Sequence, residues 1–120
     1  MAQLGIGVVT MFAVTGCVSA TNADPEYKTF VFDGAELNVD SHGTPTDLVQ
    51  TDRTDIRVTR WFDTKAVGSV ESGWELTGGT LSLVASCTGL ALCDAKFQVE
   101  VPGGLRVLRD GRQTELTGNK

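Results

Sequence analysis

Several of the residues and motifs on which enzymes depend are scarce or missing in this chain. It has a single histidine, His42, and it contains no G-x-S-x-G elbow, no P-loop and no G-x-G-x-x-G pattern. A lipase-like hydrolase and a nucleotide-binding domain therefore both lack support. His42 lies in the run Asp40-Ser41-His42-Gly43, which is typical of an exposed turn rather than of a catalytic base. We expect no catalytic residue, no cofactor and no enzymatic activity.

Charge is absent from residues 1–23, because all 10 basic and all 15 acidic residues lie at Asp24 or beyond. This break in composition indicates two segments with different roles. The net charge of −5 also argues against nonspecific binding of nucleic acid, so we expect no nucleic-acid partner.

The first segment has the size of a targeting signal. The stretch from Leu4 to Val14 is apolar or small except at Thr10. It is too short to cross a hydrocarbon core as a helix, which takes roughly 20 apolar residues, but it matches the apolar region of a signal peptide. The start, Met1-Ala2-Gln3, lacks the usual basic residue, so either the true start lies upstream or the N-terminal amine supplies the charge.

The end of this segment resembles the bacterial lipobox, with Val14, Thr15 and Gly16 followed by Cys17. The resemblance implies a lipoprotein signal peptide over residues 1–16, cleaved before Cys17, and a diacylglyceryl group on the Cys17 thiol. Residues 17–27 would then be the lipidated cysteine and a flexible tether. The protein would be extracytoplasmic and anchored in the cell membrane by its lipid. The alternatives are a cysteine buried in an apolar strand and an ordinary cleaved secretory signal.

The two other cysteines, Cys87 and Cys93, are separated by five residues. In an oxidising compartment such a pair usually forms a disulfide, and the alternative is two free buried thiols. Two thiols and one distant histidine do not make a four-ligand zinc set, so we expect no metal site. The acids Asp40, Asp47, Asp52 and Asp55 match no calcium-loop pattern and indicate a solvated acidic loop.

The body of the chain, residues 28–120, shows alternation of apolar and polar residues with a period of two. No window sustains a helical period, and glycines punctuate the apolar runs. The pattern predicts an all-β sandwich, barrel or solenoid. The expected inward residues are Leu37, Val39, Ile56, Val58, Leu81, Leu83, Phe97, Val99, Val101, Leu105 and Val107.

Residues 74–108 resemble a bacterial β-solenoid family of unknown function whose members are labelled as adhesins. The resemblance is carried by the strand pattern at 79–83 (GTLSL), the cysteine pair, and the stretch 97–103 (FQVEVPG). It extends upstream to AELNVDSHG at 35–43 and to DIRVTRWF at 55–62, and in all it covers about residues 30–117.

The resemblance implies a right-handed single-chain β-solenoid, in which short strands stack as parallel rungs around a continuous core. Family members continue for several rungs after the proline strand, so only the first rungs are expected here. Either the chain is a fragment or it caps its own end. The implied function is a non-enzymatic, lipid-anchored surface module that binds an envelope protein or glycan. The alternative is a β-helix enzyme acting on envelope polysaccharide, which would need two carboxyl groups together in a groove, with Glu75, Glu100 and Asp110 available.

One surface patch is a candidate for partner binding. Trp61 is out of phase with the inward residues Ile56 and Val58, and Arg57 and Arg60 lie close to it in sequence. Aromatic and guanidinium groups together recognise sugars and proteins, whereas packing of Trp61 at the rim of the core is the competing interpretation.

Overall fold

The computed structural model describes residues 19–65, 68–89 and 92–114. In chain order the elements are the 3-10 turn η2 (Ala20–Asn22) and the strands β1 (Glu26–Phe30), β2 (Glu36–Asp40), β3 (Thr46–Thr51), β4 (Ile56–Lys65), β5 (Gly68–Thr77), β6 (Thr80–Gly89), β7 (Leu92–Pro102), β8 (Arg106–Arg109) and β9 (Arg112–Gln113). Over these ranges there is no α-helix, which confirms the prediction of an all-β protein. None of the described elements is a helix long and apolar enough to cross a membrane.

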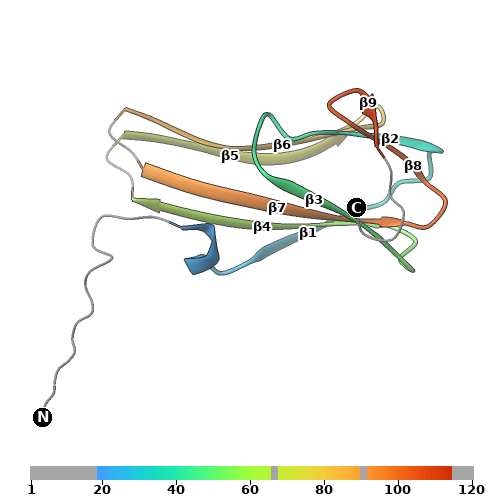
Figure 1. Cartoon of the computed structure of the whole chain (residues 1–120), viewed down its shortest axis with the longest axis horizontal. Coiled ribbons are helices and arrows are strands. Elements are labelled where there is room, and N and C mark those ends of the chain that lie inside the picture. The colour runs from blue at the N-terminus through green and yellow to red at the C-terminus, as the bar shows by residue number, and fades with distance from the viewer. Residues whose placement is uncertain (1–18, 66–67, 90–91, 115–120) are drawn as a thin grey trace, which may run out of the picture.

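The strands form two mixed sheets packed face to face. The four-stranded sheet has the order β1-β4-β7-β3, and the five-stranded sheet has the order β5-β6-β2-β8-β9. In Figure 1 the long strands β5 and β6 lie above β4 and β7, and all four run along the long axis of the molecule. This layered arrangement buries one face of each sheet against the other, as the alternation of apolar and polar residues requires.

Two segments of the chain cross from one sheet to the other, and they stack on each other through parallel strand pairing. Strands β2 and β3 are consecutive but lie in different sheets, and so do β6 and β7. Strand β2 runs parallel beside β6, with Val39 opposite Leu81, and β3 runs parallel beside β7, with Leu48 opposite Val99. The β2–β3 unit therefore stacks on the β6–β7 unit with the same chain direction in both sheets. Strand β8 lies parallel to β2 on its other side, whereas β1, β4, β5 and β9 pair antiparallel with their neighbours.

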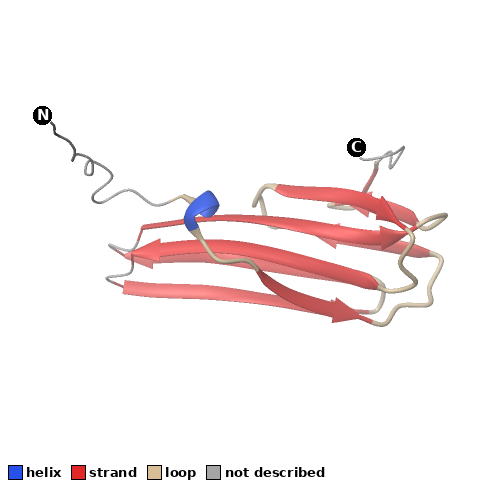
Figure 2. Cartoon of the chain, turned by 90° about the horizontal axis from the view of Figure 1, so that it is seen from below, coloured by secondary structure: helices blue, strands red, loops and turns tan. Residues whose placement is uncertain are grey.

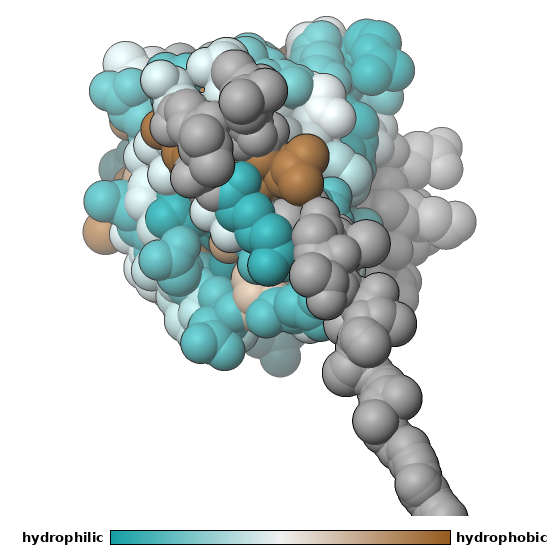
Figure 3. Space-filling view, turned by 90° about the vertical axis from the view of Figure 1, so that its left-hand side faces the viewer, coloured by the Kyte–Doolittle hydropathy of each residue, from teal (hydrophilic) through white to brown (hydrophobic). Residues whose placement is uncertain are grey.

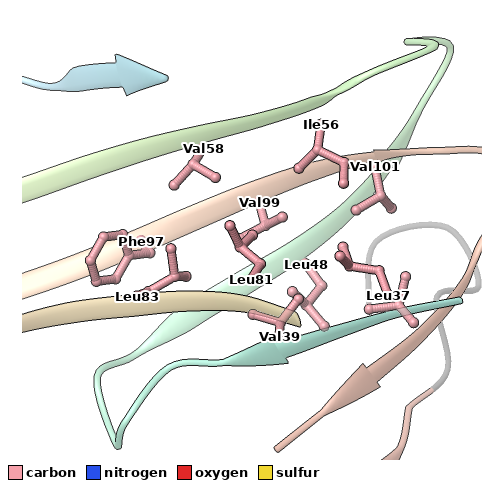
Figure 4. Close-up of a cluster of buried hydrophobic side chains, with 11 residues drawn as sticks. Leu37, Val39, Leu48, Ile56, Val58, Leu81, Leu83, Phe97, Val99 and Val101 are labelled. Carbon is pink, nitrogen blue, oxygen red and sulfur yellow. The ribbon is translucent and has the colours of Figure 1, made fainter. Parts of the chain in front are cut away.

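The core lies between the sheets and is built from aliphatic residues and one phenylalanine (Figure 4). It consists of Leu37, Val39, Leu48, Ile56, Val58, Leu81, Leu83, Phe97, Val99, Val101 and Val107. All the predicted inward residues except Leu105 are buried here, and Leu105 packs half-buried against the cluster. Leu48 was missed because its stretch, TDLVQT, places two apolar residues side by side next to an acid, which reads as a loop.

Beyond the core, two antiparallel strand pairs, β4 with β7 and β5 with β6, continue as arms. We call "the arms" the parts of β4, β5, β6 and β7 at residues 60–65, 68–74, 84–89 and 92–96. Here the sandwich is only β4 and β7 against β5 and β6, and burial falls: Ala95 is the one arm residue that is fully buried among those described. Cys87 on β6 and Cys93 on β7 form a disulfide across the two sheets, with their Cα atoms 6.3 Å apart. The predicted disulfide is therefore present, and it links the two layers of the arms.

A tight turn joins β5 to β6 at the end of this pair of strands that is away from the disulfide. Thr77 and Thr80 are opposite each other, so only Gly78 and Gly79 form the connection. Their φ angles are +58° and +85°, the left-handed values that a two-residue hairpin turn with a primed geometry requires. Glycine adopts these angles without the Cβ penalty that other residues incur.

The stretch expected to be a flexible tether, residues 17–27, is docked over its described part. Strand β1 begins at Glu26 and pairs with β4, so the sheet starts inside the expected tether. The turn η2 packs on β4 and β7, and Ala20 is only 6% exposed. Figure 2 shows this turn lying across the strands. The polar composition suggested a free linker, but the polar atoms here bond to the sheet, and a small alanine fits against it.

Candidate interaction face on the four-stranded sheet

The outer surface of the four-stranded sheet carries Arg57 and Trp61, two of the three residues of the expected binding patch. Since Ile56 and Val58 on β4 point into the core, the odd-numbered residues of this strand point outward. The register places a residue of β7 opposite each of them. The outward pairs are Arg57 with Glu100, Thr59 with Gln98, Trp61 with Lys96, and Asp63 with Asp94. We call this set the outer face.

Arg57 forms the charged end of the outer face nearest the core. Its guanidinium carbon lies 4.4 Å from the centroid of the Tyr27 ring, and its Nε is 3.5 Å from Oε2 of Glu100. Thr59, beside this group, is only 4% exposed although it lies on an outer surface. The Tyr27 side is open, since this residue is 55% exposed. An exposed cation–π contact contributes roughly 0.5–1 kcal/mol, so this group is ordered but still accessible.

Trp61 lies at the centre of the outer face. The Nζ of Lys96 is 5.3 Å from the centroid of its ring, and the same Nζ is 4.0 Å from Oδ2 of Asp47 on β3. A hollow of about 280 Å³ is lined by Trp61, Lys96, Ala20 and Thr21. The indole is half-buried between the sheet and the turn η2. The ring therefore packs beside the turn and keeps an open edge, and the binding of a partner by Trp61 stays a prediction.

Two carboxylates at the far end of the outer face hold the turn η2. The backbone N–H of Ser19 donates to Oδ2 of Asp63 at 2.9 Å, and the N–H of Ala20 donates to Oδ2 of Asp94 at 2.7 Å. Ser19 in turn caps the turn, because its side chain accepts from the N–H of Thr21. Asp63 and Asp94 are directly opposite in the sheet, where two like charges repel each other. The two backbone donors that meet them offset that repulsion.

Arg60 does not belong to the outer face. As an even-numbered residue of β4 it points between the sheets, where its guanidinium carbon stacks 4.1 Å from the centroid of the Trp74 ring on β5. Its Nε and Nη2 both donate to Oε1 of Glu26, at 2.9 and 2.7 Å. The side chain of Arg60 is 12% exposed and that of Glu26 is 59% exposed. The expected patch of Arg57, Arg60 and Trp61 is thus divided, with Arg60 on the inner side of the sheet.

A polar cleft of about 600 Å³ opens between the arms beside Arg60. Its walls come from β4 and β5, with Phe62, Thr64, Val70 and Ser72 among them, and residues 22–24 lie along its edge. Among the charged groups lining it, Glu26 is bound to Arg60 and Asp63 accepts from Ser19, and Asp24 adds a third carboxylate. This cleft can admit water and small polar molecules.

The remaining expected sites are separated from this face or lie outside the described residues. Cys17 and the lipobox residues Val14, Thr15 and Gly16 precede the first described residue, Ser19. His42 lies in a turn with a φ of +52°, and its side chain is 48% exposed. Its Nδ1 is 3.0 Å from the carbonyl oxygen of Leu83, which gives this ring a structural contact.

The acids weighed for catalysis or metal binding are dispersed. Glu75 on β5 and Glu100 on β7 lie on the outer surfaces of opposite sheets, so the sandwich separates them. Asp110 bonds to the N–H of Ser41 and pairs with Arg112. Within the described ranges, no three His, Cys, Asp or Glu residues form a group that could hold a metal ion.

Comparison with known proteins adds no relative. No protein-family model, no curated protein and no solved structure matches the chain. The functional interpretation therefore depends on the sequence motifs and on the geometry of the outer face.

Proposed function

We propose that this chain is a non-enzymatic, lipid-anchored protein of the bacterial cell envelope that binds an envelope glycan or protein through the outer face. The observation that carries the proposal is the arrangement of Trp61, Arg57 and Tyr27 on one side of a rigid sheet, beside the docked turn that follows the lipobox. Aromatic rings with a guanidinium at their side recognise sugars and protein surfaces without any catalytic group. The interstrand disulfide is in keeping with an oxidising, extracytoplasmic location.

The proposed architecture is a partial β-solenoid, as in the adhesin-labelled family that the sequence resembles. Its support is the parallel stacking of the β2–β3 unit on the β6–β7 unit in both sheets, which is the arrangement of two successive solenoid rungs. On this proposal the antiparallel strands β1, β4 and β5 cap one side of the two rungs. A right-handed course of the chain is part of the same proposal.

The alternative of a polysaccharide-acting enzyme has less support. A glycosidase needs two carboxyl groups within about 5–10 Å of each other on one groove. Glu75 and Glu100 lie on opposite sides of the sandwich, and Glu26 in the polar cleft is bound to Arg60. We therefore favour a binding module.

The anchoring part of the proposal is tested by intact mass spectrometry of the full chain expressed in a bacterial host, together with membrane fractionation. We expect loss of residues 1–16, a diacylglyceryl adduct and recovery in the membrane fraction. The Cys17→Ser variant, which has no thiol to acylate, serves as the control and should lack the adduct. An uncleaved wild-type chain with a free Cys17 thiol would refute the anchor.

The binding part is tested by co-sedimentation of the protein with purified cell-wall sacculi of the host and, separately, by crosslinking in intact cells. Trp61→Ala and Arg57→Gln should each reduce the bound or crosslinked fraction several-fold. Glu75→Gln, on the outer surface of the opposite sheet, is the matched control and should bind as the wild type does. Equal retention by the Trp61→Ala protein in both assays would exclude the outer face as the binding surface.

A further inference from the structure

Strand β5 leaves one side of its backbone open. It is the outermost strand of the five-stranded sheet, and among the described residues β6 is the one strand that pairs with it. The outermost strands of the two sheets are β1, β3, β5 and β9, and they contain five, six, ten and two residues. The pairing of β5 with β6 continues without a bulge from Gly68 to Thr77. The longest open edge in the described part of the chain is therefore that of β5, which follows the long axis of the molecule (Figure 1).

The backbone groups at this open edge follow from the pairing of the neighbouring strands. Strand β2 runs parallel to β6, and the N–H of Asn38 donates to the carbonyl oxygen of Gly79 at 2.9 Å. Backbone direction alternates along a strand, so odd-numbered residues of β6 face β2 and even-numbered residues face β5. Each pair between β5 and β6 joins an odd to an even number, so the odd-numbered residues of β5 face β6. The N–H and C=O groups of Val70, Ser72 and Trp74 consequently face the open edge.

The polar cleft lies beside this edge. Val70 and Ser72 line it, and Val70 is 40% exposed. A strand added along β5 would direct every second side chain to the same side as Val70 and Ser72, toward the cleft. The cleft has a volume of about 600 Å³, so it has room for long side chains that the closed core does not offer.

The charge around the edge is mainly negative. Asp24, Glu26 and Asp63 line the cleft together with one cation, Arg60, which is already bound to Glu26. On the other side of β5, Glu71 is exposed. Figure 3 looks onto the end of the arms and shows mostly teal, hydrophilic atoms with a few brown, apolar ones. A segment that fits this edge on both sides therefore carries positive charge and is not mainly apolar.

We propose that residues 70–74 of β5 and the polar cleft bind an extended, basic segment of a partner protein by strand addition. We call this the edge site. Adjacent residues of a strand point to opposite sides, so two consecutive basic residues would serve both: one opposite Glu71, the other entering the cleft lined by Asp24. Backbone hydrogen bonds supply the affinity and the side chains the selectivity. This goes beyond binding by the outer face, because it uses the open edge of the other sheet.

A second copy of β5 is the competing occupant of the edge site. Residues 68–77 contain acidic residues but no Lys or Arg. Two such strands side by side would bring like charges together, which is destabilising. The same carboxylates that favour a basic partner therefore disfavour pairing of the chain with itself.

The test is NMR of the ¹⁵N-labelled full chain, purified from a bacterial host in a zwitterionic detergent and titrated with the peptide acetyl-TVTKKVT-amide. We expect shifts concentrated in the amides of residues 69–76 and 22–26. Ser72→Pro removes an N–H that faces the edge and not β6, so it should keep the fold and weaken binding about tenfold. Glu71→Lys should weaken it about threefold without any change in the backbone. Thr29→Pro is the matched control: its N–H also faces an open edge, that of β1, and affinity should change less than about twofold.

The outcomes distinguish the edge site from its competitors and from the outer face. Failure of the basic peptide to bind, equal binding of acetyl-TVTEEVT-amide, or a larger loss in Thr29→Pro than in Ser72→Pro overturns the proposal. Shifts of amides 69–76 that depend on protein concentration without peptide would assign the edge to a second copy and overturn it too. Trp61→Ala should bind the peptide as the wild type does, so a failure of the outer face in the sacculus assay leaves the edge site standing.

Discussion

The two halves of the sandwich are held together by different means. The half that contains β2, β3 and β8 closes around a core in which Phe97, Leu37 and Ile56 are completely buried. The arms have only two strands in each layer and contain few buried residues, and they depend on the Cys87–Cys93 disulfide, the Arg60–Trp74 stack and the docked turn η2. Burial of apolar surface stabilises the first half along its whole length. The disulfide, the Arg60–Trp74 stack and the docked turn each stabilise the arms at one place only. The comparison teaches that the same strands can be core at one end and scaffold for a surface at the other.

The largest expected effect comes from emptying the core. Phe97→Ala removes a fully buried ring from β7 and should lower the free energy of unfolding by about 3–5 kcal/mol. Because β7 runs from the core into the arms, we expect both halves to lose stability together in urea unfolding followed by tryptophan fluorescence. Gln98→Ala, the next residue on the outer face, is the control and should change stability by no more than about 0.5 kcal/mol. A comparable loss in both variants would contradict the assignment of the core.

Breaking the disulfide should affect the arms selectively. Cys87→Ser/Cys93→Ser opens a short loop and should cost about 2 kcal/mol on the chain-entropy model. Hydrogen exchange of amides 68–74, 84–89 and 92–95 should accelerate, while amides of β2 and of the core part of β7 keep most of their protection. Ser86→Ala, next to the bridge and exposed, should leave exchange unchanged. If exchange rose equally everywhere, the arms and the core would be a single cooperative unit.

The same type of substitution, glycine to alanine, can be made in both halves for direct comparison. Gly78→Ala forces a Cβ onto a residue with a φ of +58° at the β5–β6 turn and should cost about 1–2 kcal/mol. Gly73→Ala lies in the arm part of β5, where a Cβ meets nothing within 4 Å, and should be neutral or stabilising by about 0.5 kcal/mol. Thermal unfolding of the two variants measures the difference. Equal costs would show that the left-handed turn is not under the expected constraint.

The smallest expected effect concerns Arg60. A double-mutant cycle with Arg60→Met and Trp74→Leu should give a coupling energy of about 1 kcal/mol, because the guanidinium is mostly shielded from water where it stacks on the indole. Glu26→Gln should cost less than about 0.5 kcal/mol, since the Glu26 carboxylate is largely exposed. Additive single effects for Arg60 and Trp74 would mean that the ion pair with Glu26, and not the stack, positions this arginine.

Local patterns were enough to predict much of the fold. The alternation of apolar and polar residues identified every side chain of the core cluster except Leu48, because the side-chain period of a strand is two and one face must be dry. Leu48 escaped because its strand, β3, does not alternate cleanly, and it is covered only because β7 runs beside it in parallel. Proximity in sequence put Arg57 and Arg60 in one patch, although alternation along a strand already favoured Arg60 on the side of Ile56 and Val58, where the structure has it.

The sequence by itself determined the class of the molecule: an all-β body with a dry face, a cysteine pair close enough to bridge, and an uncharged N-terminal segment that contains a lipobox-like motif. Only the tertiary structure decided which sheet each strand joins, that the disulfide crosses between the sheets, and that the polar stretch from Ser19 onward is docked rather than free. The physical reason is range. Alternation and turn residues act between neighbours in sequence, whereas Asp63 and Asp94 reach Ser19 and Ala20 across separations of 44 and 74 residues, which no local pattern records.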